Sequence, residues 1–157
     1  MDENPTLLHA LLAQNAELAQ ALGEAIWAFS MVERLTYRYL RKLSSEPLDE
    51  LMADQPFKGR VRLIRHLVDR LQGQEEAKVR AKRYLDESEK LAATRNLLAH
   101  NPWQVWIDFE QSVFKSAVKK ITNEKKSIDL EKVRAFRDDA GELASNLEHL
   151  LGELRYP

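Results

Sequence analysis

The sequence predicts an all-α fold, an up-and-down helical bundle with a small β-hairpin inserted before the last helix. Through most of the 157 residues, apolar side chains recur at spacings of three and four, which is the period of an amphipathic helix. Five glycines and five prolines are few for this length, and the prolines fall between the periodic segments. One short stretch changes to a period of two, which is typical of strands. The length suits a single domain over residues 1–157.

The first third of the chain is predicted to form a long helix and a short one. Apolar residues keep helical spacing over 17–43, and an earlier helical stretch over 7–12 precedes that helix. The Ser-Ser-Glu-Pro stretch at 44–47 should end it, because proline lacks a backbone N–H and disfavours helical geometry in the residue before it. Residues 47–53 suffice for one short helix.

Two further helices are predicted in the middle of the chain. Residues 56–73 repeat the three-and-four spacing, and Gly73 suits the left-handed residue that follows many helices. The next periodic segment covers 75–100. It should end next to His100, because Pro102 restricts the residue before it.

The following segment is predicted to form the hairpin. Residues 103–109 alternate apolar and polar side chains, which indicates a strand. Residues 113–121 are the expected partner strand, although their apolar spacing also fits one face of a helix. A turn is expected at 123–126. Trp103 and Trp106 suit either packing of the hairpin onto the helices or stacking against a nucleic-acid base.

The last helix has the clearest start signal. Asp129 suits the N-cap position, and Ile128 and Val133 on either side of it suit a hydrophobic staple. An apolar stripe then follows at helical spacing: Leu130, Val133, Phe136, Ala140, Leu143, Leu147, Leu150 and Leu154.

Composition excludes several classes of protein. The chain has no cysteine, which excludes disulfides, thiolate zinc sites and cysteine nucleophiles. Its formal net charge of −1 argues against attraction to nucleic acid by bulk charge. The acidic start at Asp2 and Glu3 and the lack of a long apolar run predict a cytoplasmic protein that does not contact membranes.

The sequence predicts no metal site and no cofactor. The four histidines are scattered, no HExxH motif occurs, and no Glu stands three residues before a His. The five glycines are isolated, so there is no glycine-rich phosphate loop. No GxSxG motif is present for serine hydrolase chemistry.

Charge is distributed unevenly along the chain. Residues 56–83 carry nine Lys or Arg against three acids, whereas residues 1–24 carry four acids and no Lys or Arg. The basic run fits either a solvated helix face or a surface that follows an RNA backbone. On the second interpretation the RNA-binding candidates are Lys58, Arg60, Arg62 and Arg65.

Residues 95–100, Arg-Asn-Leu-Leu-Ala-His, form the strongest candidate site. Arg95 falls on the apolar stripe of its helix, where a charge must be paired, face a groove or enter a subunit interface. Asn96 and His100 share a helix face, whereas Arg95 and His100 are about 140° apart around the axis. The group places a fixed cation, an amide and an imidazole at one helix end.

These three side chains suit phosphodiester chemistry. A guanidinium can stabilise charge on a phosphate, and a neutral imidazole can take up and return a proton. Purely structural roles also fit the pattern. His100 could simply favour a helix C-terminus through the helix dipole, Asn96 could be a surface amide, and Arg95 could pair with Glu33 on the long helix.

The motif Arg95-Asn96-x-x-x-His100 resembles the signature of the HEPN domains (higher eukaryotes and prokaryotes nucleotide-binding). In that family an Arg, a polar residue, three others and a His end a late helix of a small all-α bundle. The resemblance implies that Arg95 stabilises the phosphate, that His100 is the acid and base, and that Asn96 supports them. Glu33 interrupts the apolar stripe of the long helix, which suits either a partner that orients Arg95 or a solvated residue at the edge of the stripe.

The resemblance also implies a function. Many HEPN proteins are metal-independent endoribonucleases, often toxins of toxin–antitoxin or other defence systems, with a composite active site at a homodimer interface. RNA is then the expected substrate, an antitoxin protein a further partner, and a 2′,3′-cyclic phosphate the product of attack by the 2′-hydroxyl. The alternative is a catalytically inactive HEPN-like helical dimer that binds a nucleotide, RNA or a protein partner.

Overall fold

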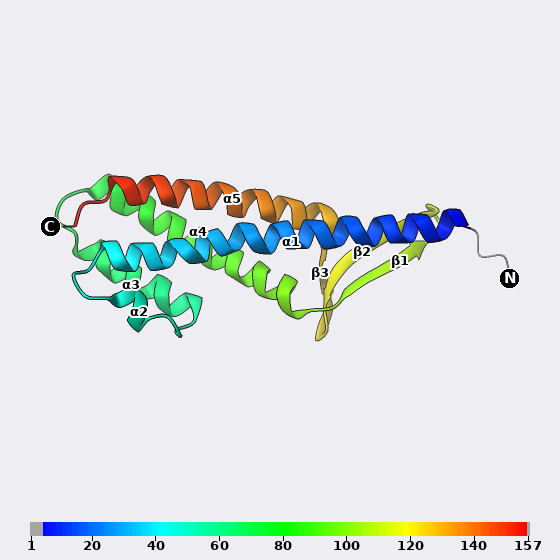
Figure 1. Cartoon of the computed structure of the whole chain (residues 1–157), viewed down its shortest axis with the longest axis horizontal. Helices are drawn as coiled ribbons and strands as arrows, with labels where there is room; N and C mark the ends of the chain where they lie inside the picture. The colour runs from blue at the N-terminus through cyan, green and yellow to red at the C-terminus, as the bar shows by residue number, and fades with distance from the viewer. Residues whose placement is uncertain (1–4, 157) are drawn as a thin grey trace.

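The computed structural model describes residues 5–156, which form five helices and three strands. The helices are α1 (Pro5–Lys42), α2 (Leu48–Leu51), α3 (Phe57–Arg70), α4 (Glu75–His100) and α5 (Leu130–Glu153). The strands are β1 (Trp103–Asp108), β2 (Val113–Lys120) and β3 (Asn123–Asp129), and they lie between α4 and α5 in the chain (Figure 1). The predicted helical bundle with a β insertion before the last helix is therefore confirmed.

Helix α1 extends along the whole molecule (Figure 1). It has 38 residues and is about 57 Å long. The two helical stretches predicted at 7–12 and 17–43 are one helix, because no Gly or Pro separates them and the intervening Ala, Gln and Asn are compatible with a helix. Its first turns leave Leu7, Leu8 and Leu12 exposed, so the apolar stripe does not mark this part.

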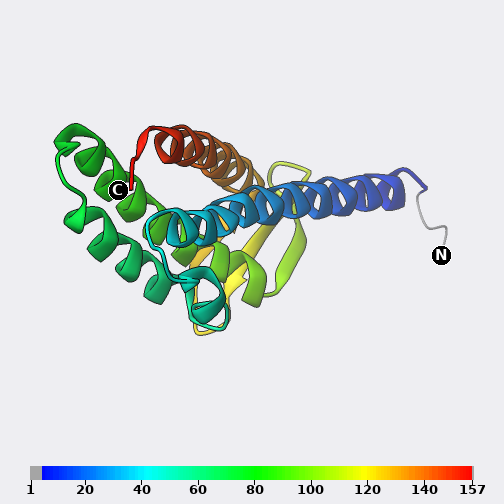
Figure 2. The same cartoon turned by 60° about the vertical axis from the view of Figure 1, so that its left-hand side comes forward.

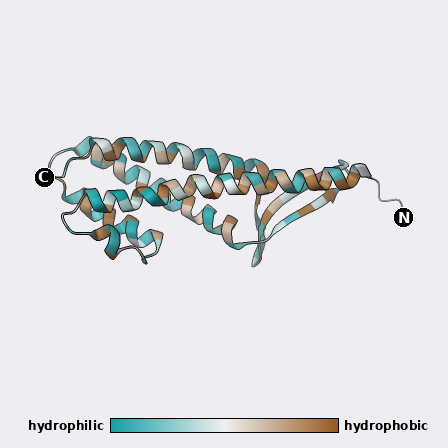
Figure 3. Ribbon diagram, viewed as in Figure 1, coloured by the Kyte–Doolittle hydropathy of each residue, from teal (hydrophilic) through white to brown (hydrophobic). Residues whose placement is uncertain are grey.

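Helices α1 and α5 pack side by side and run in the same direction. Ion pairs join Glu17 to Arg134 near their starts and Arg38 to Glu148 near their ends. Helix α4 runs the opposite way and packs against both (Figures 1 and 2). Apolar and polar residues mix along each helix, as amphipathic helices around a shared core require (Figure 3).

The centre of the core is aromatic. Phe29 of α1 is fully buried, and its ring centroid lies 5.4 Å from that of Phe57 on α3 and 6.1 Å from that of Phe136 on α5. The buried Tyr39 donates its hydroxyl hydrogen to the carbonyl of Leu147 at 2.8 Å. Burial also raises the pKa of this phenol.

The antiparallel sheet has β2 as its central strand. Val118 pairs with Trp103 of β1 and with Ile128 of β3, and its side chain is fully buried against the helices. Gln14 of α1 donates to the hydroxyl of Ser116 at 3.1 Å. The first half of α1 is thereby attached to the sheet.

The third strand was not predicted from the sequence. Residues 123–126 belong to β3 and not to a turn, and the turn lies at 121–122. The helical alternative for 113–121 is also wrong, because β2 occupies Val113–Lys120. Strand β3 is rich in polar residues and pairs with β2 through backbone hydrogen bonds. Its sequence therefore lacks the alternation of apolar and polar side chains from which a strand is predicted.

Asp108 organises the tip of the hairpin. Its carboxylate lies 2.5 Å from the Lys115 ammonium and accepts hydrogen bonds from the backbone N–H groups of Glu110 and Gln111 at 3.0 and 3.1 Å. These contacts, chiefly the one to Lys115, hold the pKa of Asp108 below its usual range. The loop between β1 and β2 is thus closed by one carboxylate.

The predicted start of the last helix is confirmed. Asp129 accepts a hydrogen bond from the backbone N–H of Lys132 at 2.9 Å, as an N-cap residue does. Among residues 5–156, no helix is both long enough and apolar enough to cross a membrane.

Candidate functional site

Arg95 of α4 lies against α1. Its Nη2 is 2.7 Å from Oε1 of Glu33, which confirms the predicted pair, and its guanidinium carbon lies 5.3 Å from the ring centroid of Phe29. The Arg95 side chain is 23% exposed. Its Nε is buried and has no hydrogen-bond partner within residues 5–156.

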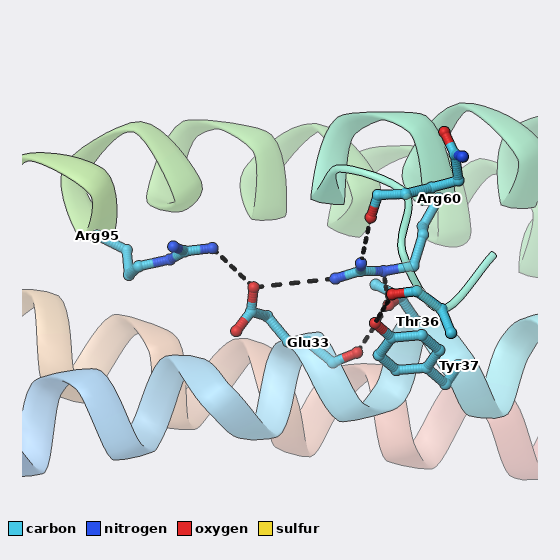
Figure 4. A network of polar contacts seen from close by, with 7 residues as sticks. Glu33, Thr36, Tyr37, Arg60 and Arg95 are labelled. Atoms are coloured by element: carbon cyan, nitrogen blue, oxygen red, sulfur yellow. Dashed lines mark hydrogen bonds and ion pairs between the residues drawn. The ribbon is translucent and has the colours of Figure 1, made fainter. Parts of the chain in front are cut away.

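A second arginine approaches the same carboxylate (Figure 4). Nη2 of Arg60, on α3, is 3.9 Å from the same Oε1 of Glu33. Arg60 also donates from Nε to the hydroxyl of Thr36 at 3.1 Å and from Nη1 to the carbonyl of Gln55 at 2.7 Å. Its guanidinium carbon is 4.4 Å from the centroid of the Tyr37 ring.

The prediction that Arg60 binds RNA is therefore wrong. The residue is only 5% exposed, and its donors point into the interior. The spacing of basic residues along α3 could not reveal the burial of Arg60, because its partners come from α1 and from the loop before α3. Arg60 instead holds α3, α1 and Glu33 together.

Replacing Arg60 by alanine should lower the free energy of unfolding by about 2–4 kcal/mol, since the Gln55 carbonyl and Glu33 lose a charged partner inside the protein. Urea unfolding would measure the loss. The matched control is Arg62→Ala, at an exposed neighbour of the same type, which should change stability by less than about 0.5 kcal/mol. Equal losses in the two variants would contradict the structural role of Arg60.

Most of the basic segment 56–83 is neutralised by neighbouring acids. Arg65 contacts Asp86 at 2.6 Å and Glu89 at 3.0 Å. Among the four RNA-binding candidates, only Lys58 and Arg62 are exposed and without an ion pair within residues 5–156. Further pairs in the segment are Arg80–Glu153, Lys82–Asp69, Lys78–Glu75 and Arg83–Glu87.

Asn96 and His100 are both exposed on the last two turns of α4. The helix ends at His100, as predicted, and the next residue fixes that end. Asn101 donates from Nδ2 to the carbonyl of Leu97 at 2.9 Å, and its Oδ1 accepts from the N–H of Ile121 at 3.2 Å. The end of α4 is thereby held against the turn between β2 and β3.

Arg95 and His100 lie five residues apart on α4, which is about 140° around the axis of an ideal helix. In the part of the chain that the structure describes, no hydrogen bond or ion pair joins them, and Arg95 is engaged by Glu33 on the α1 side. The last two turns of α4 therefore carry a cation held by Glu33 and an exposed imidazole.

A cavity of about 530 Å³ opens beside Arg95, between the start of α3 and α4. Its polar lining consists of Lys58, Glu89, Arg95 and Asn96, and its apolar wall includes Phe57. Sequence reasoning missed this cavity. The start of α3 and the end of α4 are far apart in the chain, and only the packing of the helices makes them neighbours.

A second hollow, of about 720 Å³, lies on the side of α1 that faces β1. It is lined by Gly23, Ile26, Trp27 and Trp103, among others, and Trp27 is 69% exposed. Sequence reasoning missed Trp27, although its position off the three-and-four apolar spacing of α1 was a signal that could have found it. The hollow itself arises only where β1 approaches α1.

The two tryptophans of the sheet have different surroundings. Trp103 packs against the helical core and lines this hollow, so the packing interpretation holds for it. Trp106 is 37% exposed, and Lys119 Nζ lies 4.6 Å from the centroid of its ring.

In comparisons of the chain with protein-family models, with curated proteins and with solved structures, nothing matches.

Proposed function

We propose that this protein is a metal-independent endoribonuclease of the HEPN type, the toxin of a toxin–antitoxin or defence system, with a composite active site at a homodimer interface. The observation that carries the proposal is the arrangement on α4. Arg95 is held in place by Glu33 beside an open cavity, while His100 is exposed one turn beyond Asn96. A positioned cation and an accessible imidazole are the two groups that this reaction requires.

In the proposed reaction the 2′-hydroxyl of a ribose attacks the adjacent phosphorus. The neutral imidazole of His100 takes the hydroxyl proton as the new oxygen–phosphorus bond forms. Arg95 stabilises the negative charge that builds on the non-bridging oxygens. The bond to the 5′-oxygen breaks, this oxygen receives a proton from an imidazolium, and the products are a 2′,3′-cyclic phosphate and a 5′-hydroxyl.

The proposal includes a second copy of the chain, because the resemblance to the HEPN domains implies a composite site between two copies. The face of α1 that carries Trp27 is the expected contact. This exposed tryptophan borders the hollow that also contains Trp103, three residues after His100. A copy seated there would lie beside the motif.

Gly23 supports the same contact surface. A Cβ atom at this position would meet nothing within 4 Å, so no close approach within the chain requires glycine there. Glycine inside a helix costs roughly 0.5–1 kcal/mol relative to alanine. Gly23 lies one helical turn before Trp27 on the same surface of α1. Because it has no side chain, it would leave room for a bulky side chain of a second copy.

Replacing Trp27 by alanine should therefore weaken the dimer about 30-fold or more, since truncating a central interface tryptophan typically costs 2 kcal/mol or more. Sedimentation equilibrium of both proteins would measure this. Trp106→Ala, at a partly exposed tryptophan outside the hollow, is the matched control and should dimerise normally. A monomeric wild type, or a Trp27 variant that dimerises as well as the control, would contradict the interface.

The function itself is tested by incubating purified protein with RNA in excess EDTA. Cleavage that leaves 2′,3′-cyclic phosphate ends, identified by mass spectrometry, is the expected result. In cells, growth arrest on expression and its relief by a co-expressed neighbouring gene would test the toxin role. A folded dimer that cleaves no RNA would favour the alternative, an inactive HEPN-like dimer that binds a nucleotide, RNA or a protein partner.

A further inference from the structure

The side of α1 that faces away from α5 carries no charge over residues 6–32. In this range the helix has only two charged side chains, Glu17 and Glu24, and both pair with arginines of α5. Charged residues make up 31% of the whole chain, and the outer face of a surface helix is where they are normally found. A lack of charge on such a face is typical of the centre of a protein interface.

Seven residues on this side form one stripe. The steps between them are four, three, four, four, three and four residues, which keep them on one face of an α-helix. The order of steps is the same from either end, so two such stripes placed antiparallel match residue for residue about Ala19. Six of the seven are exposed, and Ile26 is half-buried. The stripe consists of Leu8, Leu12, Asn15, Ala19, Gly23, Ile26 and Ser30.

The two ends of the stripe differ in shape. Leu8 and Leu12 lie on the first turns of α1, which extend beyond the start of α5, and both side chains are exposed (Figures 1 and 2). The other end, over residues 19–30, borders the hollow of about 720 Å³ that Trp103 also lines. One end therefore carries uncovered leucines, and the other end carries an apolar hollow.

We propose that two copies of the chain pair through this stripe, with their α1 helices antiparallel and the two-fold axis at Ala19. In this register Leu12 lies opposite Ile26 of the second copy, and Leu8 lies opposite its Ser30. The leucines of each copy then fill the hollow of the other. This pairing rests on the homodimer of the proposed function, to which it adds the register and a role for the first turns of α1.

A second copy is the occupant that this surface favours. Two identical surfaces that meet about a two-fold axis bring like charges together, and the stripe has none to repel. Its centre consists of small side chains, so two helix backbones can approach closely there. A membrane surface fits less well, because helices that lie on membranes carry Lys and Arg on their polar face, and residues 6–33 of α1 include neither.

Cysteine cross-linking tests the register, because the chain has no cysteine of its own. Ala19→Cys should form a disulfide-linked dimer under mild oxidation, since the axis brings the two copies of this exposed residue together. Ala13→Cys, also exposed on α1 but outside the stripe, is the matched control and should stay largely unlinked. Equal linking of the two variants, or no linking of either, would overturn the register.

A charge pair tests the contact between the leucines and the hollow. Leu8→Glu should weaken the dimer about tenfold or more, because it places a charge in the hollow of the second copy. Adding Ser30→Lys supplies the opposite charge across the same contact, so the double variant should dimerise more tightly than Leu8→Glu alone. Leu51→Glu, the same change at an exposed leucine of α2, is the matched control and should dimerise as the wild type does.

Sedimentation equilibrium would measure the four proteins, with circular dichroism to verify their folding, which is expected because all three positions are exposed. Equal losses in Leu8→Glu and Leu51→Glu, or no recovery in the double variant, would overturn the pairing. A wild type that stays monomeric would also overturn it and leave the surface to a different protein.

Neither experiment depends on turnover. A dimer that links through residue 19 but cleaves no RNA would defeat only the proposed nuclease. RNA cleavage by a dimer that does not link through residue 19 would defeat only the register proposed for α1.

Discussion

Replacing His100 by alanine should lower the rate of RNA cleavage about 10²–10⁴-fold while the protein stays folded and dimeric. The imidazole is exposed at the end of α4 and makes no hydrogen bond or ion pair within the described residues 5–156, so its removal disturbs no packing. The end of the helix is held independently by Asn101. A loss of activity would therefore report the chemistry of the side chain.

Cleavage of a labelled RNA in EDTA by wild type and variant would measure the effect, with circular dichroism and sedimentation to verify fold and mass. His149→Ala is the matched control, since His149 is also exposed on a helix but lies on α5. Unchanged cleavage by the His100 variant would remove this residue from the mechanism.

A mixing experiment extends this prediction to the dimer. Arg95→Ala and His100→Ala should each be nearly inactive, but their mixture should recover part of the activity if one copy supplies the arginine and the other the histidine. Mixed dimers that form without any recovery would show that the two residues do not act across the interface in this way.

Replacing Phe29 by alanine should lower the free energy of unfolding by about 3–5 kcal/mol, which is the largest stability effect expected in this protein. The ring is fully buried where α1, α3 and α5 meet, against Phe57 and Phe136. It also lies beneath the guanidinium of Arg95. The substitution therefore opens a cavity in the core and removes the surface on which the candidate catalytic arginine rests.

Urea unfolding would measure this loss, with Phe109→Ala as the control, because that ring is 85% exposed and its removal should change stability by less than about 0.5 kcal/mol. Phe29→Leu fills more of the space and should lose less. If this milder variant is folded, its cleavage should still fall below that of wild type, since Arg95 loses its aromatic support. A loss for Phe29→Ala no larger than for Phe109→Ala would contradict the central position of this ring.

Local rules in the sequence were sufficient for the end of α4 and the start of α5. Pro102 predicted that α4 ends at His100, and Asp129 with its flanking apolar residues predicted the start of α5. The pairing of Glu33 with Arg95 was one of the alternatives that the sequence left open, because a charge on an apolar stripe must be paired, face a groove or enter an interface. In each case the deciding interaction lies within a few residues or follows from burial alone.

Features that depend on contacts between distant segments were not accessible in the same way. Strand β3 is stabilised by backbone pairing with β2, and its polar side chains carry no period from which to predict it. Arg60 looked like its exposed neighbours on α3, and only the approach of Thr36 and the Gln55 carbonyl makes it a buried residue. The charge pattern of one helix does not indicate which of its arginines are buried by a neighbouring helix.

The sequence by itself determined the helical bundle, the motif on α4 and the chemical types of the candidate site residues. Only the tertiary structure decided that Arg95 faces a cavity with Lys58 and that Trp27 is exposed beside Trp103. The physical reason is that periodicity and capping act over one or two helical turns, whereas cavities and shared counter-charges form where segments many residues apart pack together.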